Sequence, residues 1–456
     1  MVRRFLLRSF QAVYRFSQRL RRRCTPAGFL VLGGLVAAGV FGIDTQRTLA
    51  FQIFALLLSV LGLSIAMTLT FRSHLRIHRL LPEYGTVDQP LKYRVIVENL
   101  GKHAQASLSL IEELETRMPR YDEFIHSPEP SSERRNWFDR YVGYPRWLAL
   151  LQRNRGAAIR PTELDVIPPR DSIKTQVELT PARRGYLQFA RSIIARPDPF
   201  GLINAFHTTE NPQSLLVLPK RYPTPPIHLP GKRTYQHGGV SLAGSVADSQ
   251  EFTSLRDYRP GDPLRRIHWR SYAKQGELIV KEYQDEFFIR YGLVLDTFLQ
   301  DAPDEIFEEA VSVAASFACS SREKDSLLDL LFAGPDAYVF TAGRGLANTD
   351  NILEVLACVE ASRDKPFSTL QDLVFRRASQ MSAFICVLIN WDLERQEFIR
   401  RLTLANSPLL VVLIVQPGDT QALDPGPLRS ALDRFYVLEA GKIEQGLLGL
   451  DTIGIQ

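Results

Sequence analysis

The chain has 456 residues and a net charge of +5, and because this length exceeds one hydrophobic core we expect two or three domains. Residues 1–80 hold twelve Arg, no Lys and one acidic residue, Asp44, so the positive charge is confined to the N-terminus. The rest of the chain is net negative, which argues against a protein whose body binds nucleic acid. The four cysteines form no CxxC pair, and Cys319, Cys358 and Cys386 lie in apolar runs typical of buried free thiols.

Residues 1–26 form a basic leader with an amphipathic pattern. If this leader is helical, Leu6, Phe10, Val13, Ser17 and Leu20 lie near one side of the helix. Arginines occupy the rest of the circumference, as in helices that lie on an anionic membrane. We expect either such an interfacial helix, with membrane lipid as its partner, or a disordered basic leader.

Two apolar segments follow, Ala27–Ile43 and Leu49–Phe71. The second is long enough to cross a bilayer, and the first is marginal but uncharged. Basic residues flank both outer ends, among them Arg76 and Arg79, so the positive-inside rule predicts that both ends face the cytoplasm. We therefore predict a transmembrane hairpin over residues 27–71, with most of the chain cytoplasmic; a cleaved signal peptide is the competing interpretation.

Residues 80–218 are predicted to form a β-sandwich. Tyr93, Val95 and Val97 alternate with charged residues, which is typical of a half-buried strand. Further strands are expected at 106–112, 172–179, 186–194 and 214–218. Short alternating strands joined by turns favour an all-β, immunoglobulin-like sandwich.

A long excursion, residues 117–161, interrupts this domain and is rich in Arg, Pro and aromatic residues. Loops of this length inside compact domains are usually functional or disordered. Its Trp137, Tyr141, Tyr144 and Trp147 are expected either to form a patch that binds a partner or the membrane surface, or to pack the loop back onto the sheet.

Two turn motifs close the domain, PARRGY at 181–186 and RPDPFGL at 196–202. Gly185 and Gly201 are expected to take positive φ, while the prolines hold their predecessors extended.

Three further regions are distinguished by composition. Residues 219–250 are rich in Pro, Gly and Ser and are predicted to be a linker; residues 251–285 are an arginine-rich segment, and residues 286–456 an α/β domain. In the last, strands are expected at 291–295, 327–332, 383–389 and 409–415 and helices at 304–322 and 351–362. Continuous apolar strands alternating with helices imply a doubly wound sheet that binds ligands at the C-terminal ends of its strands.

The arginine-rich segment combines five arginines with aromatic residues around one acidic turn. Asp262 is expected to accept hydrogen bonds from Arg256 or Arg266, since guanidinium groups suit carboxylates, and Trp269 and Tyr258 to stack on arginine planes. The segment is then either a polar clasp that locks the sandwich onto the α/β domain, or a set of free arginines that engage an acidic partner or a phosphate.

The segment also carries a long signature, EF-x-x-LR-x-Y-x-x-GD-x-x-R-x-I-x-W-x-x-x-A. Its residues are Glu251, Phe252, Leu255, Arg256, Tyr258, Gly261, Asp262, Arg266, Ile267, Trp269 and Ala273. With PARRGY and RPDPFGL before it, the signature resembles the bacterial domain of unknown function 58 family, in which a membrane hairpin and a β-domain precede a von Willebrand factor A-like domain. The resemblance covers nearly the full chain. It implies a bacterial inner (cytoplasmic) membrane protein that pairs with a MoxR-type AAA+ ATPase. The family has no settled biochemical activity.

Von Willebrand A domains that bind a metal place D-x-S-x-S after the first strand. Here Asp296 takes the first position, but Phe298 and Gln300 replace the two serines, and Asp392 is the candidate for a later acid. Two carboxylates with a Phe between them do not suit Mg²⁺, which demands near-octahedral oxygen ligation, so no metal or other cofactor is predicted. Asp296 is instead expected to cap the following helix or to pair with a basic neighbour; a metal-dependent, adhesion-type binding module is an alternative.

The residues favour a non-enzymatic adaptor or scaffold. His268 with Asp262 or Glu251 would give a cryptic hydrolase its base and orienting acid, but no nucleophile sits in a G-x-S-x-G elbow, and a P-loop is absent. By the resemblance, the adaptor docks the ATPase to assist assembly or remodelling of membrane or envelope complexes. Its expected partners are membrane lipid, the ATPase and other membrane or envelope proteins, and not nucleic acid.

Overall fold

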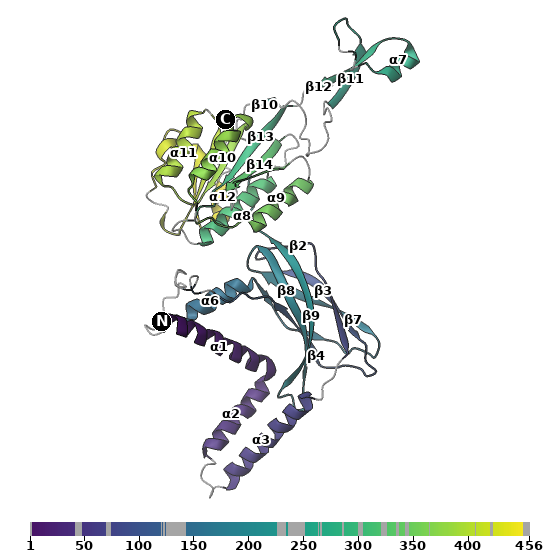
Figure 1. Ribbon diagram of the computed structural model, residues 1–456, viewed down its shortest axis with the longest axis vertical. Helices are drawn as coiled ribbons and strands as arrows, with labels where there is room; N and C mark the ends of the chain where they lie inside the picture. The colour runs from purple at the N-terminus through teal and green to yellow at the C-terminus, as the bar shows by residue number, and fades with distance from the viewer. Residues whose placement is uncertain are drawn as a thin grey trace. The chain divides into compact units, whose positions relative to one another are not determined.

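The computed structural model describes residues 2–41, 48–69, 74–119, 121, 124, 143–225, 234–235, 251–262, 264, 267–284, 287–299, 304–320, 326–333, 337–342, 346–363, 365–405, 407–419 and 423–449. The chain divides into two compact units, residues 1–218 and residues 219–456. Figure 1 labels the elements of both.

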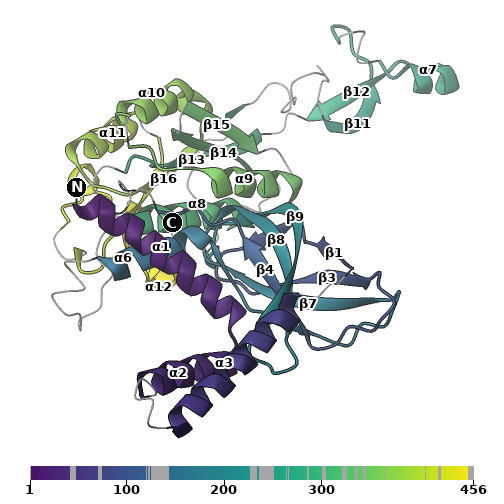
Figure 2. The ribbon, with the colours of Figure 1, turned by 60° about the horizontal axis from the view of Figure 1, so that its bottom comes forward.

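Unit 1 begins with three helices, α1 (Val2–Arg23), α2 (Pro26–Phe41) and α3 (Thr48–Leu69). Between α1 and α2 the Thr25 hydroxyl accepts a hydrogen bond from the Gly28 N–H at 3.0 Å, which starts a new helix. The break lets α1 and α2 run in different directions, as both ribbon views show (Figures 1 and 2). Helices α2 and α3 pack side by side because glycines admit larger neighbours, such as Phe54, 3.3 Å from a β-carbon built on Gly39.

Of these helices, α3 is long and apolar enough to cross a bilayer, over Leu49–Leu69. The apolar helix α2 has 16 residues, about 24 Å at 1.5 Å per residue, which is less than the roughly 30 Å of a hydrocarbon core. Helices α2 and α3 therefore pack together, and one of them, α3, meets the length of a membrane span; the predicted two-pass topology stays a prediction.

Two sheets form the rest of unit 1. One has the strand order β1 (Leu75–Leu80), β3 (Leu91–Asn99), β7 (Ser172–Pro181), β5 (Ala157–Ile159), and the other β2 (Tyr84–Thr86), β9 (Asn204–Leu218), β8 (Gly185–Pro197), β4 (Leu108–Leu114), β6 (Thr162–Leu164). Apart from the parallel pair β2–β9, the paired strands are antiparallel. The predicted alternation is confirmed, since Tyr93, Val95 and Val97 are buried in a core that β8 shares through Phe189. The strand predicted at 214–218 is the end of the much longer β9.

A charged pair lies inside this β-region. Arg79 of β1, read from the sequence as a basic residue flanking the membrane, is buried and donates to Glu112 of β4 and to Ser192 of β8. Its guanidinium lies 4.4 Å from the centre of the Phe189 ring. Burial raises the pKa of Glu112, and the Arg79 guanidinium opposes that shift. Arg79 therefore links the two sheets instead of marking a membrane boundary.

The RPDPFGL motif forms a turn that holds the helices of unit 1. Gly201 has φ 69°, and Gly185 of the other motif φ 99°, so both predicted positive values are confirmed. Within the turn, Asp198 accepts hydrogen bonds from the backbone N–H groups of Leu202 and Ile203, at 2.7 and 2.8 Å, and from the Ser64 hydroxyl of α3 at 2.7 Å. A β-carbon on Gly28 of α2 would lie 2.2 Å from the Leu202 carbonyl oxygen, so this turn touches both helices.

Part of the excursion forms helix α6 (Tyr144–Arg155), which packs against α1. Trp147 is fully buried there, beside Phe10 and Tyr14 of α1, with ring centroids 6.2 and 5.4 Å away. The aromatic residues of α6 thus neither form an exposed patch nor pack on the sheet. Trp137 and Tyr141 lie outside the described residues.

Unit 2 is an α/β domain with a mostly parallel sheet. Its strand order is β15 (Ala337–Ala342), β14 (Ser326–Ala333), β13 (Phe287–Leu295), β16 (Ala383–Leu388), β17 (Leu409–Val415), β18 (Phe435–Glu439), with the short β10 (Thr234–Tyr235) beside β13. Strands β15 and β10 are antiparallel to their neighbours and the others are parallel. The helices are α8 (Asp304–Ser320), α9 (Leu346–Cys358), α10 (Ser368–Arg377), α11 (Leu393–Leu404) and α12 (Ile443–Leu448), with 3-10 turns at Ala378–Gln380, Gly426–Leu428 and Leu432–Arg434.

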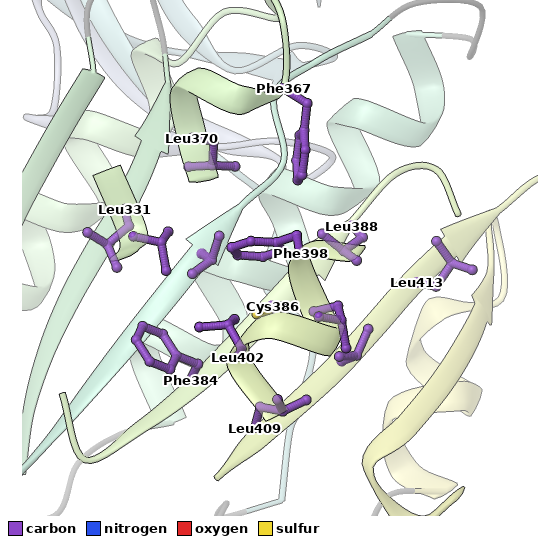
Figure 3. Packing of buried hydrophobic residues seen from close by; sticks show 14 of the residues in the cluster. Leu331, Phe367, Leu370, Phe384, Cys386, Leu388, Phe398, Leu402, Leu409 and Leu413 are labelled. Atoms are coloured by element: carbon purple, nitrogen blue, oxygen red, sulfur yellow. The ribbon is translucent and has the colours of Figure 1, made fainter. Parts of the chain in front are cut away.

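The core of unit 2 explains its apolar strands. Phe384 and Cys386 of β16 point toward Phe398 and Leu402 of α11 (Figure 3), while all six residues of the strand are buried. Burial raises the pKa of the Cys386 thiol to about 12, so this cysteine is an inert core residue. The expectation of burial is wrong for Cys358, which is exposed.

Candidate functional site

The sheet of unit 2 reverses its winding at its centre. Strands β13 and β16 are parallel neighbours, but the chain passes from β13 to β14 on one side and reaches β16 on the other. In doubly wound sheets, the loops that follow such a strand pair diverge and leave a ligand crevice. Asp296 follows β13 and Asp392 follows β16, so the two carboxylates singled out in the sequence come from the two loops at this point.

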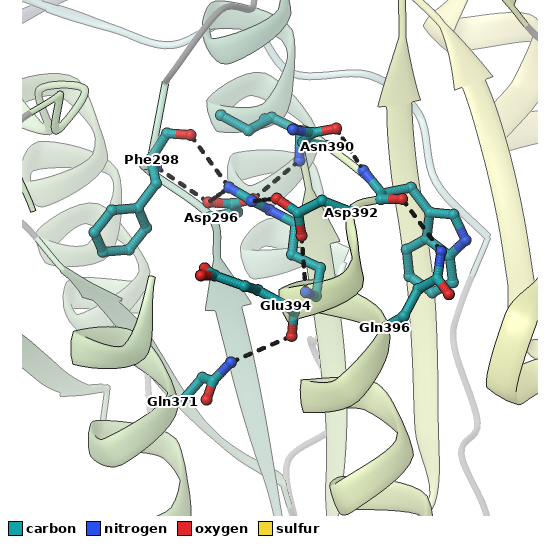
Figure 4. A network of polar contacts seen from close by, with 10 residues as sticks. Asp296, Phe298, Gln371, Asn390, Asp392, Glu394 and Gln396 are labelled. Atoms are coloured by element: carbon teal, nitrogen blue, oxygen red, sulfur yellow. Dashed lines mark hydrogen bonds and ion pairs between the residues drawn. The ribbon is translucent and has the colours of Figure 1, made fainter. Parts of the chain in front are cut away.

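Figure 4 shows Asp296, Phe298 and Asp392, the loop residues whose oxygen atoms accept hydrogen bonds from Arg395 of α11. Its Nε donates to Asp296 Oδ2 at 2.6 Å, one terminal nitrogen donates to Asp296 Oδ1 at 3.2 Å, and the other donates to Asp392 Oδ2. The guanidinium also donates to the Phe298 carbonyl oxygen at 3.2 Å and lies 4.6 Å from the centre of the Phe367 ring. Both the Arg395 and the Asp296 side chains are fully buried.

Local sequence explains how this cluster forms. Asp392 is the N-cap of α11 and accepts the Arg395 N–H at 2.9 Å, which brings Arg395 into the first turn beside the capping carboxylate. Asp296 accepts the backbone N–H groups of Phe298 at 3.1 Å and Ile389 at 3.4 Å. Burial raises the pKa of Asp296 and opposes the charge on Arg395, but Asp296 and Asp392 still raise the pKa of the guanidinium.

These residues do not fit a divalent metal ion. Both oxygens of Asp296 already bind the guanidinium, and the Phe298 side chain is a buried ring in contact with Phe367. Within the described ranges no three His, Cys, Asp or Glu side chains gather around one point, and Gln300 lies outside those ranges. The expectation that Asp296 pairs with a basic neighbour is confirmed. Asp392 is the N-cap of a different helix, α11, and not of the helix that follows Asp296.

The signature residues form a separate structure, which we call the arm (residues 251–284). Among the described strands, β11 (Glu251–Asp257) and β12 (Ile279–Gln284) pair with each other and with no other strand, and the short helix α7 (Trp269–Gln275) lies between them in the chain (Figure 1). The buried Ile267 forms a bridge with Val280 of β12. Glu251 and Phe252 are placed by their backbone pairing in β11.

The predicted charge pair of the arm is present. Arg256 donates to both oxygens of Asp262 at 2.7 Å, and the Arg259 N–H donates to the same carboxylate at 2.9 Å. The Arg256 guanidinium, followed by the Arg259 N–H, lowers the pKa of Asp262 to about 2. Gly261 has φ 108°, a value that L-residues other than glycine rarely adopt, so the turn requires it. The second predicted donor, Arg266, lies outside the described residues.

The other signature side chains are placed by local contacts. Tyr258 donates its backbone N–H to Leu278 at 2.9 Å, and Trp269 meets the Tyr272 ring edge-to-face at a centroid distance of 6.1 Å. His268 precedes α7, and its Nδ1 lies 2.6 Å from the Ser271 hydroxyl oxygen. The Asp262 carboxylate is held by Arg256, so the structure does not bring it to His268 as a hydrolase would require.

The surface of the arm is apolar and basic. Leu264 and Trp269 expose 66% and 60% of their surfaces, more than core residues ever do. The other exposed large apolar residues are Leu255, Tyr272 and Leu278, and the exposed basic residues include Arg259, Arg270 and Lys274. A short hairpin that leaves so much apolar surface in water is typical of a protein-binding element.

Sequence reasoning missed two residues that organise these regions. Arg395 is not among the residues singled out from the sequence, although the spacing Asp392-x-x-Arg395 is that of a helix cap and its first turn. Asp198 was seen only as part of a turn motif, and its bond to Ser64, 134 residues earlier, has no signal in the sequence.

Comparison with known proteins adds a family. Residues 254–421 match the family described as "Protein of unknown function DUF58". The uncharacterized protein YeaD of Bacillus subtilis (strain 168) is 27% identical over 201 residues, which cover 43% of this chain and 48% of YeaD. The chain thus spans about half the length of this curated relative.

Solved structures resemble the chain weakly. The CARDB domain of the PF1109 protein from Pyrococcus furiosus, determined in complex with di-metal ions, is 13% identical and covers 32% of this chain and 96% of its own, with a TM-score of 0.17. The PapD-like domain 7 of human CEP192 is 10% identical and covers 32% and 86%, with a TM-score of 0.18. Such TM-scores carry no argument about function. The family match is the informative comparison: residues 254–421, from the arm to beyond β17, are similar to the DUF58 family.

Proposed function

We propose that the chain is a membrane-anchored, non-enzymatic adaptor whose arm docks a MoxR-type AAA+ ATPase. The observation that carries the proposal is the arm itself, a self-paired hairpin with Trp269, Leu264 and Tyr272 exposed. Exposed tryptophan and tyrosine next to arginine are the residue types enriched at the energetic centres of protein interfaces. Docking would assist assembly or remodelling of membrane or envelope complexes.

The choice of partner follows from the family resemblance and from charge. The exposed basic residues of the arm are Arg259, Arg270 and Lys274, and its exposed acids are Asp257 and Glu277. Basic residues are therefore in slight excess on the described surface of the arm, since Asp262 is engaged by Arg256. A basic, aromatic element suits a partner surface that is acidic at its rim and apolar at its centre. We infer that the partner is an AAA+ ATPase with such a surface. The von Willebrand A-like domain that the resemblance implies for unit 2 is compatible with this partner.

The anchor in this proposal is the α2–α3 hairpin. Helix α3 meets the length of a span, and the shorter α2 would cross with it as a two-pass unit in a bacterial inner membrane, since glycines pack the two together. Both ends of such a hairpin lie on one side, and the arginines around it favour the cytoplasmic side. The arm would then face a cytoplasmic ATPase.

The sheet edge supports an adaptor more than an enzyme. At the position where doubly wound folds bind ligands, the buried Arg395 guanidinium fills the space between the loops after β13 and β16. Both carboxylates at this position are bound to Arg395, so they are not free to bind a metal ion. Recognition through the arm therefore needs no divalent cation.

Site-specific photocrosslinking in native membranes tests the proposal. A photoreactive amino acid replaces Trp269 in the full chain, and a matched control carries it at Leu393, which is 82% exposed in the same unit. We expect mass spectrometry to identify a MoxR-type ATPase crosslinked at position 269 but not at 393. Recovery of no ATPase at 269, or equal recovery at both positions, would refute the docking role.

A hydrolase is the second candidate, and one contact favours it: the Ser271 hydroxyl lies 2.6 Å from His268 Nδ1. This spacing is also that of a helix cap with the third residue of its helix, which is the simpler explanation. A hydrolase predicts that Ser271→Ala and His268→Ala abolish turnover of acyl substrates by the purified chain while leaving its thermal unfolding unchanged. The adaptor predicts no turnover to abolish.

A further inference from the structure

Helix α1 presents three different faces. Because successive helical residues are rotated by about 100°, Leu7, Phe10 and Tyr14 share one stripe, and this stripe packs against α6. A second stripe, about a third of a turn away, holds Val13 and Phe16, with Leu20 in line. The apolar side expected from the sequence is therefore divided between one stripe that contacts protein and one that does not.

The second stripe is open to solvent. Val13 and Phe16 expose 59% and 69% of their surfaces, values unusual for two large apolar neighbours on one helix. The third stripe is basic and consists of Arg8, Arg15 and Arg19, all exposed. Helix α1 contains no acidic residue. An apolar stripe beside a purely cationic one is the arrangement of helices that lie in the headgroup region of an anionic bilayer.

The position of α1 in the chain supports a lipid contact. Only Cys24 and Thr25 separate it from α2, and both pair with the 198–203 turn: Cys24 forms a bridge with Ile203, and the Thr25 N–H donates to Leu202 at 3.0 Å. Since α1 and α2 run in different directions (Figures 1 and 2), a membrane-crossing α2 leaves α1 along the membrane surface.

The same turn carries a further exposed aromatic residue. Phe200 exposes 46% of its surface at the point where the turn meets the bases of α2 and α3. A phenylalanine at the end of a membrane helix pair is placed where apolar rings insert beneath the headgroups. Val13, Phe16 and Phe200 are thus apolar groups on elements joined at the start of the hairpin.

We propose that the outer face of α1, with Val13 and Phe16 toward the acyl chains and Arg8, Arg15 and Arg19 toward lipid phosphates, binds an anionic membrane surface, with Phe200 inserted beside it. This inference rests on the membrane anchor of the proposed function but not on the ATPase. It gives α1 two simultaneous partners, α6 on one side and lipid on the other, so the leader holds the sandwich at the membrane.

The test uses the full chain in nanodiscs of phosphatidylcholine, alone or mixed with phosphatidylglycerol. An environment-sensitive fluorescent amino acid replaces Phe16, and a second chain carries it at Leu56 of α3, which is 62% exposed. We expect the probe at 16 to shift to the blue and to be quenched by nitroxide lipids in the anionic nanodiscs, with a smaller effect in neutral ones. Raised salt should weaken the difference between the two lipids.

Charge reversal supplies the decisive variants. Arg8→Glu/Arg15→Glu/Arg19→Glu should abolish the lipid-dependent shift at position 16, whereas Arg160→Glu/Lys174→Glu/Arg183→Glu, an equal charge change at exposed sites of the sandwich, should leave it intact. The three Arg→Lys changes should also retain it. If the probe at 56 is quenched and that at 16 is not in either lipid, the lipid face is refuted and the anchor stands. Absence of quenching at both positions would refute the anchor too.

Discussion

Two arginine–carboxylate pairs in this chain share one chemistry and differ in surroundings. Arg395 and Asp296 are wholly buried at the sheet edge, whereas Arg256 and Asp262 lie in the arm with 35% and 16% of their side chains exposed. A buried pair matters for the stability of the fold, because removal of either charge leaves the other charge buried without water or a partner. An exposed pair shapes only its own turn, because water screens it. The buried pair therefore occupies the candidate site at the sheet edge, whereas the more exposed pair shapes the arm, which is the other candidate site.

The largest expected effect comes from breaking the buried pair. Arg395→Met leaves the Asp296 carboxylate buried and uncompensated, and this should lower the free energy of unfolding by about 3–5 kcal/mol. Calorimetry on the full chain in detergent measures the loss as a lower Tm. Asp296→Asn/Arg395→Met should lose less than Arg395→Met alone. Arg400→Met removes an exposed pair with Glu397 on the same helix and is expected to leave the Tm unchanged. A wild-type Tm for Arg395→Met would contradict this interpretation.

An intermediate effect is expected at the turn that holds the membrane helices. Asp198→Ala removes an acceptor of several hydrogen bonds, and Ser64→Ala removes one of its donors. The first should cost about 1–3 kcal/mol, and the second less. Protease cleavage at the 198–203 turn, compared with Ser59→Ala on the exposed side of α3, measures the loosening. Equal cleavage of all three variants would show that the turn is held by other contacts.

The same turn should respond to pH. Burial opposes the charge on Asp198, but the bonds from Ile203, Ser64, Leu202 and Phe200 outweigh it and lower the pKa of the carboxyl. The stability that Asp198 adds is therefore fully present above the ordinary carboxyl pKa and is lost as the pH falls through the lowered value. Cleavage of the wild-type turn should rise at acidic pH and that of Asp198→Ala should not. A rise of equal size in both chains would exclude Asp198 as the cause.

The smallest effect is expected in the arm. Asp262→Asn should increase tryptic cleavage after Arg256 without changing the Tm, since the described strands of the arm pair with each other and not with the α/β sheet. Because the pKa of Asp262 is about 2, its contribution is present at all pH values above the ordinary carboxyl range and disappears as the pH falls toward 2. Glu277→Gln, which changes an exposed acid of the same arm away from the cleaved bond, is the matched control. A Tm loss from Asp262→Asn would favour the clasp interpretation, in which the segment secures the domains.

Much of the fold follows from the sequence because burial leaves a periodic trace. The alternation around Val95 predicts β3, and the continuous apolar runs predict β16 and β17. The sequence analysis does not predict β15 and β18: β18 is short and only partly buried, and β15 is an antiparallel edge. Helix α6 was missed because its burial depends on α1, far away in the chain.

The candidate sites were predictable to a different degree. The pair Arg256–Asp262 spans six residues and could be expected from a turn at Gly261. The pair Arg395–Asp296 spans 99 residues, and an arginine in a helix ordinarily indicates a solvated face. Charges that pair over a long separation in the sequence leave no periodic pattern. The pairing of Asp296 and Asp392 with the buried Arg395 is therefore seen only in the folded sheet.

The bond between Ser64 and Asp198 has a consequence for biosynthesis. If α2 and α3 are the membrane anchor that we propose, the 134 residues between Ser64 and Asp198 mean that α3 would enter the membrane before the ribosome has made this carboxylate. The hairpin would then be held first by the packing of its two helices. The bond to Asp198 would form only after β8 and β9 pair, so insertion of the hairpin would precede folding of the β-region.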